Sequence, residues 1–238
     1  MRAILISLLL ALPLHAQEVD LELVLLADAS GSIDQSEIDL QRQGYAAAIT
    51  HPDVVYAIQS TLTGTIAVTY VEWAANQVTV VDWTIIDGPE TAAAFAAQLV
   101  PPPRLAYGRN AIGAALLEGR RLIDANEITG LRRVIDFSGD SINNWSGPGI
   151  AEARAEVLAA NITINGLPIL RPGDPGRSGS NLEAEYAERI IGGPGAFVVT
   201  ADGRDSFARA VRRKLILEIA GLMPGDTLPR APRPLPKG

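Results

Sequence analysis

The chain has 238 residues and no cysteine, and its 27 acidic residues outnumber its 20 lysines and arginines, so its net charge is −7. This charge argues against a nucleic-acid-binding protein, because neutralising phosphates needs clustered Lys and Arg. It also argues against attachment to an anionic membrane surface. Without cysteine there are no disulfides, no thiolate metal sites and no cysteine nucleophile.

The N-terminus has the pattern of an export signal. Arg2 supplies a positive charge, the run from Ala3 to Leu14 is almost wholly apolar, and Ala16 offers a small residue for cleavage. A permanent membrane helix needs about 20 apolar residues, so this run is too short to span a bilayer. We therefore predict a signal peptide at 1–16, no stable membrane span and a periplasmic or secreted protein. A buried N-terminal helix is the alternative.

Short apolar or β-branched runs predict strands, and amphipathic stretches between them predict helices. In chain order we expect a strand at 22–27, a helix at 34–48, strands at 65–73 and 77–86 joined by a tight turn, helices at 89–100 and 110–123, a strand at 132–137, a helix at 150–160, a strand at 162–170, a loop at 171–180, a helix at 181–191, a strand at 196–200 and a helix at 205–220.

Alternating strands and helices predict an α/β fold. We expect a doubly wound, mainly parallel sheet with one antiparallel edge strand and helices on both faces. Residues 17–222 would form this domain, and residues 223–238 would form a proline-rich, flexible tail. Ligands of such sheets bind beyond the carboxyl ends of the strands.

Candidate ligands for a metal follow two of the predicted strands. Asp28, Ser30 and Ser32 come directly after the first strand, and Asp140 follows the strand at 132–137. If these two strands are neighbours, both aspartates converge at one end of the sheet. Carboxylates and hydroxyls form a hard oxygen site that suits Mg²⁺ or Mn²⁺ better than Ca²⁺. Helix capping is the alternative, but it explains only one or two of these residues.

These motifs resemble those of von Willebrand factor A domains. The segment LLADASGSI is similar to the first metal motif of that family, and Asp140 in VIDFSGDSINN resembles its late aspartate. The resemblance covers about residues 20–221. The segments SGDSINN, IIGGPGAFVVTA and FARAVRRKLILEIA further resemble an exported bacterial family of A-like proteins with no assigned function.

The resemblance implies a fifth ligand at Asn110. A domains usually place a threonine there, in a context that matches residues 108–113 of this chain. An asparagine carbonyl can also ligate a cation, although Asn110 could bind through water or only cap a helix. The neighbouring Arg109 adds a positive charge, which would weaken cation binding or attract an acidic partner.

The resemblance also implies a binding module rather than an enzyme. In A domains the cation keeps an open position that accepts a carboxylate from a protein partner, and a divalent ion is a strong anchor for such a group. Trp145 and Arg109 are the predicted partner contacts. Trp145 could equally pack onto a neighbouring helix, and the partner and the oligomeric state stay open.

Two other functions compete with this prediction. The departure at Asn110 leaves open a structural or interaction domain that binds no metal. The sequence Gly139-Asp140-Ser141 is similar to the nucleophile motif of one esterase class, with Ser141 as the nucleophile. That chemistry needs a general base, usually histidine, and no histidine follows His51. Glu72, Asp82 and Asp87 could be acids of a second site, but nothing in their spacing separates them from ordinary surface charge.

Overall fold

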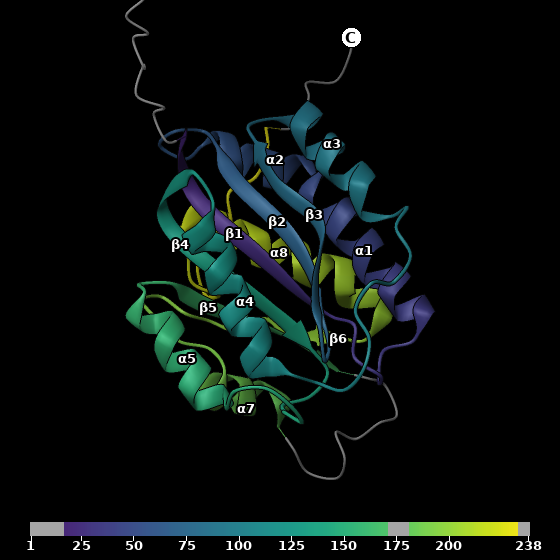
Figure 1. Ribbon diagram of the computed structural model, residues 1–238. Helices are drawn as coiled ribbons and strands as arrows, with labels where there is room; N and C mark the ends of the chain where they lie inside the picture. Colours follow the sequence, from purple (N-terminus) through teal and green to yellow (C-terminus); the bar gives the residue numbers. More distant parts are fainter. Residues whose placement is uncertain (1–16, 171–180, 233–238) are drawn as a thin grey trace, which may run out of the picture.

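A six-stranded sheet forms the centre of the computed structural model, which describes residues 17–170 and 181–232 (Figure 1). In spatial order the strands are β3 (Gln77–Ile86), β2 (Ile66–Trp73), β1 (Gln17–Asp28), β4 (Ile128–Gly139), β5 (Thr163–Leu170) and β6 (Ala201–Asp202). Neighbouring strands pair in parallel, except that β3 pairs antiparallel with β2 at one edge. The predicted fold class is confirmed.

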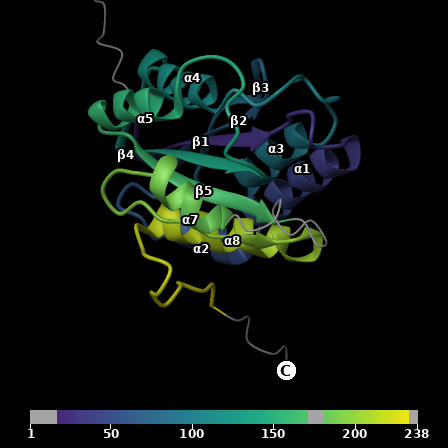
Figure 2. The same cartoon turned by 90° about the horizontal axis from the view of Figure 1, so that it is seen from below.

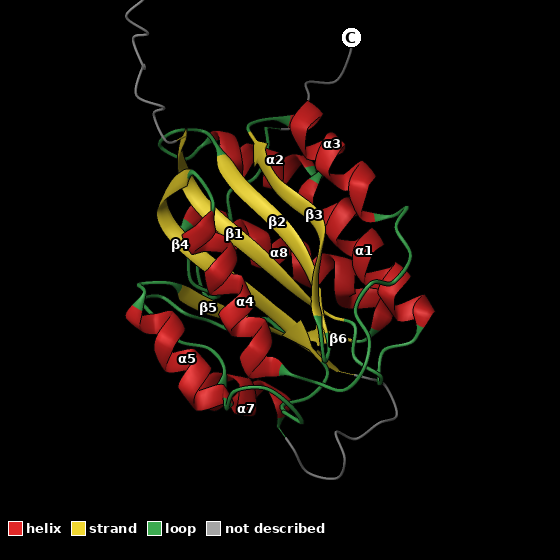
Figure 3. Ribbon diagram, in the orientation of Figure 1, coloured by secondary structure: helices red, strands yellow, loops and turns green. Residues whose placement is uncertain are grey.

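Helices cover both faces of the sheet, as Figures 2 and 3 show. One face packs against α1 (Gln35–Ile49), α2 (Pro52–Gln59), α3 (Pro89–Leu99) and α8 (Arg204–Ala220). The other face packs against α4 (Ile112–Ala125), α5 (Ile150–Ala159) and α7 (Leu182–Arg189). No helix in the described part of the chain is long and apolar enough to cross a membrane.

The continuous apolar sequence of β1 follows from its central position. Leu21, Leu23 and Leu25 point into the core beneath α1 and α8, whereas Val24 and Leu26 point into the core beneath α4 and α5. A strand buried on both faces has no polar side, so alternation disappears and a hydrophobic run remains. This run is what made the first strand recognisable in the sequence.

Two elements differ from the sequence prediction. The helix α2 was missed, although His51 caps it by accepting from Asp53 N and Pro52 occupies its first turn. The strand predicted at 196–200 is wrong in position, because β6 is the short pair Ala201–Asp202. Within 196–200 only Val198 forms a bridge to β5. Phe197 N–H donates to the side chain of Asn165 and not to the backbone of β5.

The described part of the proline-rich segment contacts the domain. Ala231 N–H donates to Asp53 Oδ1 at 3.0 Å, and Leu228 packs against the core beneath α1 and α8. The flexibility expected of residues 223–238 stays a prediction, and residues 233–238 lie outside the described residues. The same holds for the predicted signal peptide and the predicted loop at 171–180.

Buried charges attach α8 to the sheet. Lys214 Nζ lies 2.8 Å from Asp136 Oδ1 of β4 and also donates to Glu218 Oε1, which accepts from Asn165 Nδ2 at 3.0 Å. Burial raises the pKa of Glu218 to about 7, although the Lys214 ammonium opposes this shift. Two carboxylates therefore share one lysine in the core, and a proton on one of them balances the charge.

Replacing Glu218 with glutamine is expected to reduce the pH dependence of stability. The folded protein keeps a proton on Glu218 that the unfolded chain loses above its ordinary pKa of 4.5. This contribution is complete below that value and is lost as the pH rises through 7, on the order of 3 kcal/mol in all. Urea unfolding at pH 5 and pH 8 measures it. Glu188→Gln, at an exposed position, should keep the wild-type decline. An equally steep decline in Glu218→Gln would contradict the expectation.

Candidate metal centre

The two predicted aspartates lie together at the carboxyl ends of neighbouring strands. Asp28 is the last residue of β1, Asp140 directly follows β4, and these strands pair in parallel. Asp140 N–H points at Asp28 Oδ2, with an N–O distance of 3.4 Å. The Asp28 side chain is fully buried, whereas Asp140 is partly exposed. The site therefore combines the buried carboxylate of Asp28 with the more exposed carboxylate of Asp140.

The two serines of the predicted motif join the aspartates by hydrogen bonds. Ser30 N–H donates to Asp28 Oδ1 at 2.7 Å, which folds the loop back over the strand end. The hydroxyls of Ser30 and Ser32 are 3.2 Å apart, and Ser32 Oγ donates to Asp140 Oδ1 at 3.1 Å. Hydrogen bonds thus join four of the five predicted ligands into one cluster.

The electrostatics of this cluster favour a bound cation. Burial, followed by the negative charge of Asp140, raises the pKa of Asp28 to about 7. A divalent cation would relieve this repulsion, and carboxylates and hydroxyls are ligands that such ions accept. Among the described residues no group of three or more His, Cys, Asp or Glu is placed to hold a metal. The cation would therefore depend on two carboxylates and on uncharged oxygens.

Asn110 lies beside this cluster, on the loop before α4. Its Nδ2 donates to Ser141 Oγ at 3.1 Å, next to Asp140 in sequence. The same loop meets the serine motif where Gly31 N–H donates to Gly108 O at 2.8 Å. With its nitrogen on Ser141, the amide of Asn110 has its carbonyl oxygen available as a ligand. Whether this oxygen ligates a cation stays a prediction.

The two predicted partner residues stack on one another. The Arg109 guanidinium lies 5.3 Å from the centre of the Trp145 ring, and Trp145 N–H donates to Asn110 O at 2.8 Å. Trp145 is 61% exposed, so the open face of its ring is turned to solvent and not buried under a helix. The pair is thus attached to the loop of Asn110 and accessible from outside.

Arg104 and Gln41 were missed in the sequence, and both hold the serine motif in place. Arg104 donates to the carbonyls of Ala29, Ser30 and Ile33, the last two at 2.7 and 2.9 Å. Gln41 Nε2 donates to Asp28 O at 2.9 Å. Neither residue lies near the motif in sequence, so no local pattern could have identified them.

Glu72 is a buried structural acid, and not the surface charge that its spacing could not exclude. Glu72 Oε1 accepts from Arg42 at 2.6 Å, and Glu72 Oε2 accepts from Leu105 N–H at 2.7 Å. Both charged side chains are almost completely buried. The pair links β2 and α1 to the loop that carries Asn110, and thereby positions one side of the site.

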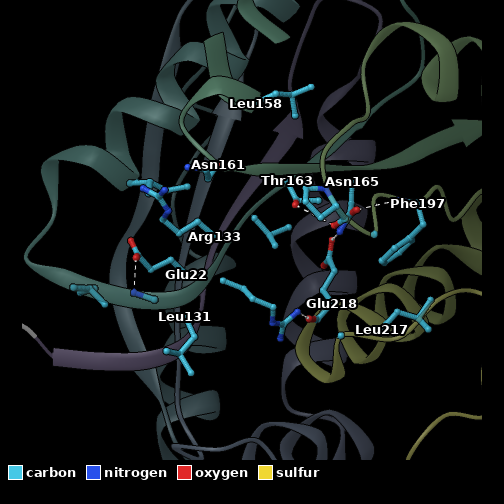
Figure 4. Close-up of a pocket in the computed structure, with 18 of the residues that line it drawn as sticks. Glu22, Leu131, Arg133, Leu158, Asn161, Thr163, Asn165, Phe197, Leu217 and Glu218 are labelled. Carbon is cyan, nitrogen blue, oxygen red and sulfur yellow. Dashed lines mark hydrogen bonds between the residues drawn. The ribbon is translucent and has the colours of Figure 1, made fainter. Parts of the chain in front are cut away.

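A pocket of about 760 Å³ lies at the other end of the sheet and is shown in Figure 4. Glu22, Arg133, Thr163 and Glu218 are among its lining residues, and they come from the starts of strands and the end of α8. None of the predicted metal ligands lines it. The chemistry predicted from the sequence therefore belongs to the opposite edge of the molecule.

The sequence matches the family described as "Protein of unknown function (DUF1194)" over residues 18–223. A search of curated proteins found no match.

Solved structures show that the fold is that of a von Willebrand factor A domain. The von Willebrand factor type A protein from Catenulispora acidiphila has a TM-score of 0.61 at 17% identity, covering 85% of this chain and 43% of that chain. The vWF domain of the type V pili tip protein Mfa5 from Porphyromonas gingivalis has a TM-score of 0.55 at 10% identity, covering 88% and 98%.

A third structure, proximal thread matrix protein 1 from the mussel byssus with a zinc occupied MIDAS motif, has a TM-score of 0.57 at 14% identity, covering 83% of this chain and 46% of that chain. This chain thus spans less than half the length of the Catenulispora and mussel chains. At such identities the likeness shows the fold alone.

Replacing Gly139 with alanine is expected to damage the candidate centre. A methyl group there would lie 2.9 Å from Asp28 Oδ2, 2.9 Å from the Trp73 ring and 3.0 Å from Tyr186 Oη. Such overpacking costs about 1–3 kcal/mol of unfolding free energy, which urea denaturation measures. Gly225→Ala is the control, because its methyl would meet no atom within 4 Å. Equal stability of the two variants would refute the expected crowding.

Proposed function

The chain belongs to the DUF1194 family of proteins of unknown function, and we propose that it is an exported binding module that uses a divalent cation to engage an acidic group on a protein partner. The observation that carries this proposal is the hydrogen-bonded cluster of Asp28, Ser30, Ser32 and Asp140 at the ends of two central strands.

The proposed cation is Mg²⁺ or Mn²⁺. Asp28, Ser30, Ser32, Asp140 and Asn110 would hold it, all through oxygen atoms, which are the ligands that these hard ions prefer. The metal in the mussel protein of the same fold is zinc, so the choice of ion needs measurement. When bound, the ion would supply a positive centre that can accept a carboxylate from a partner.

Trp145 and Arg109 are the proposed partner contacts. Exposed tryptophan and arginine are enriched among residues that dominate protein interfaces, and here they stack beside the Asn110 loop. The positive charge of Arg109 suits a partner with an acidic residue. Such a partner would place its carboxylate toward the cation and an apolar surface against the Trp145 ring.

We also propose that the protein acts outside the cytoplasm. The support is the sequence pattern of residues 1–16, in which the positive charge of Arg2 precedes an apolar run and the small residue Ala16.

The contacts of Ser141 give no support to the esterase alternative. Ser141 Oγ accepts from Asn110 Nδ2 at 3.1 Å and lies 3.4 Å from Asn143 N. A serine nucleophile needs a base that takes its proton. Of the histidines, only His51 lies in the described part of the chain, and its ring contacts Asp53 N and Arg212.

Cation binding is the first test of the proposed function. Calorimetric titration of Mg²⁺ and Mn²⁺ into the purified chain should give saturable binding to one site. Asp28→Asn and Asp140→Asn should each weaken it by more than about 100-fold, because loss of outer-shell partners alone typically costs 10- to 100-fold. Asp82→Asn, at an exposed acid on β3, should bind as the wild type does. Absence of binding to the wild type would end the proposal and favour a metal-free domain.

Partner capture is the second test. Trp145→Ala should leave cation affinity unchanged and weaken binding of a captured exported protein about tenfold or more, as expected for an interface hot spot. The assay compares pull-downs from the exported fraction with magnesium, with chelator and with Asp28→Asn as bait. Capture that is equally strong in all three would contradict a cation-dependent interface.

A further inference from the structure

Tyr186 of α7 has a buried hydroxyl with no hydrogen-bond partner among the described residues. Its ring is fixed on both sides: the Phe137 ring centre is 5.8 Å away, and a methyl group on Gly166 would lie 2.9 Å from Tyr186 Cδ1. Burying an unpaired hydroxyl is unfavourable, and phenylalanine would fill the same space without this cost. The hydroxyl therefore needs an explanation beyond packing.

The hydroxyl faces the candidate metal centre. Tyr186 Oη and Asp28 Oδ2 border the same small gap above Gly139, where a methyl group would lie 3.0 Å from the first oxygen and 2.9 Å from the second. Burial, and after it the charges of Asp28 and Asp140, raise the pKa of Tyr186 well above its ordinary value. The group thus stays protonated and can act as a hydrogen-bond donor.

The two oxygens of Asp28 differ in how well they are held. Oδ1 accepts from Ser30 N–H at 2.7 Å, whereas the contact of Oδ2 with Asp140 N is long, at 3.4 Å. Oδ2 is therefore the oxygen with room for another donor, and it is the one beside Tyr186. A ligating carboxylate typically depends on such outer partners to keep its orientation.

We propose that Tyr186 is a positioning residue for the cation site: its hydroxyl donates to Asp28 Oδ2 when a divalent cation is bound and holds the carboxylate in its ligating orientation. This inference rests on the proposed function. It assigns to α7 the task of holding the buried ligand Asp28 in place.

Tyr186→Phe should not lower the stability of the cation-free protein, but it should weaken cation binding. In the cation-free protein the variant removes an unpaired buried hydroxyl, so thermal stability should stay the same or rise. In the loaded protein it removes a hydrogen bond to a ligand, so cation affinity should fall. A residue that only fills space would not separate these two quantities.

Tyr45 provides a matched control. It also has a buried hydroxyl without a hydrogen-bond partner among residues 17–170 and 181–232. However, it lies on the opposite face of the sheet, where its ring packs edge-on against Tyr70 and Phe207. Tyr45→Phe makes the same chemical change away from Asp28.

The experiment is a calorimetric titration of Mn²⁺ into the wild-type chain, Tyr186→Phe and Tyr45→Phe, together with thermal unfolding of each in chelator. We expect the Kd of Tyr186→Phe to rise about tenfold, with an unfolding temperature in chelator at or above that of the wild type. Tyr45→Phe should keep the wild-type Kd.

A wild-type Kd in Tyr186→Phe would overturn the positioning role while leaving the proposed function intact. A weaker affinity accompanied by a lower unfolding temperature in chelator would also overturn it, because that result marks a structural residue. Failure of the wild type to bind Mn²⁺ would instead overturn the proposed function, and this inference with it.

Discussion

The burial of the Asp28 carboxylate beside Asp140 is the constraint around which this end of the molecule is organised. Parallel pairing of β1 with β4 fixes both acids at the same end of the sheet. The helices on both faces bury Asp28 completely. Asp28 accepts from the backbone N–H groups of Ser30 and Asp140 and from the Ser30 side chain. These donors carry partial charges, so they offset the cost of a buried carboxylate without neutralising it. A positive ion is the group that would.

The acids beneath α8 show the contrast. There Asp136 and Glu218 also lie together in the core, but Lys214 bridges them and Asn165 donates to Glu218 Oε1. That cluster supplies its own cation and needs only a proton to be neutral. The described residues thus include one acid pair in the core that a lysine balances, and another pair at an open strand end with serine hydroxyls around it. The first is suited to attaching a helix, and the second to taking a cation from solution.

Sequence reasoning succeeded where the chemistry is local. The apolar run of β1 reflects burial on both faces, and a parallel sheet requires that Asp28 and Asp140 meet once β1 and β4 are neighbours. It failed for Arg104 and Glu72, whose partners are distant in the chain. It also failed for α2, which begins at a histidine cap instead of at a common capping residue. Burial of a charged side chain is a tertiary property, so no window of neighbouring residues reveals it.

The residues of the site indicate more about the function of this chain than its fold does. Relatives in structure with identities between 10% and 17% share the arrangement of strands, but the fold does not carry ligands with it. The chemistry at the carboxyl ends of the strands bears on function more directly: an asparagine turned toward Ser141, an arginine stacked on an exposed tryptophan, and a buried tyrosine hydroxyl beside Asp28. The raised pKa of Asp28 and the unpaired hydroxyl of Tyr186 are both unfavourable in the cation-free protein, and one bound cation would relieve both. An ion on Asp28 would keep the carboxylate ionised, so that Oδ2 could accept from that hydroxyl. Two costs that a single ligand removes are more simply explained by a binding site than by two independent defects of packing.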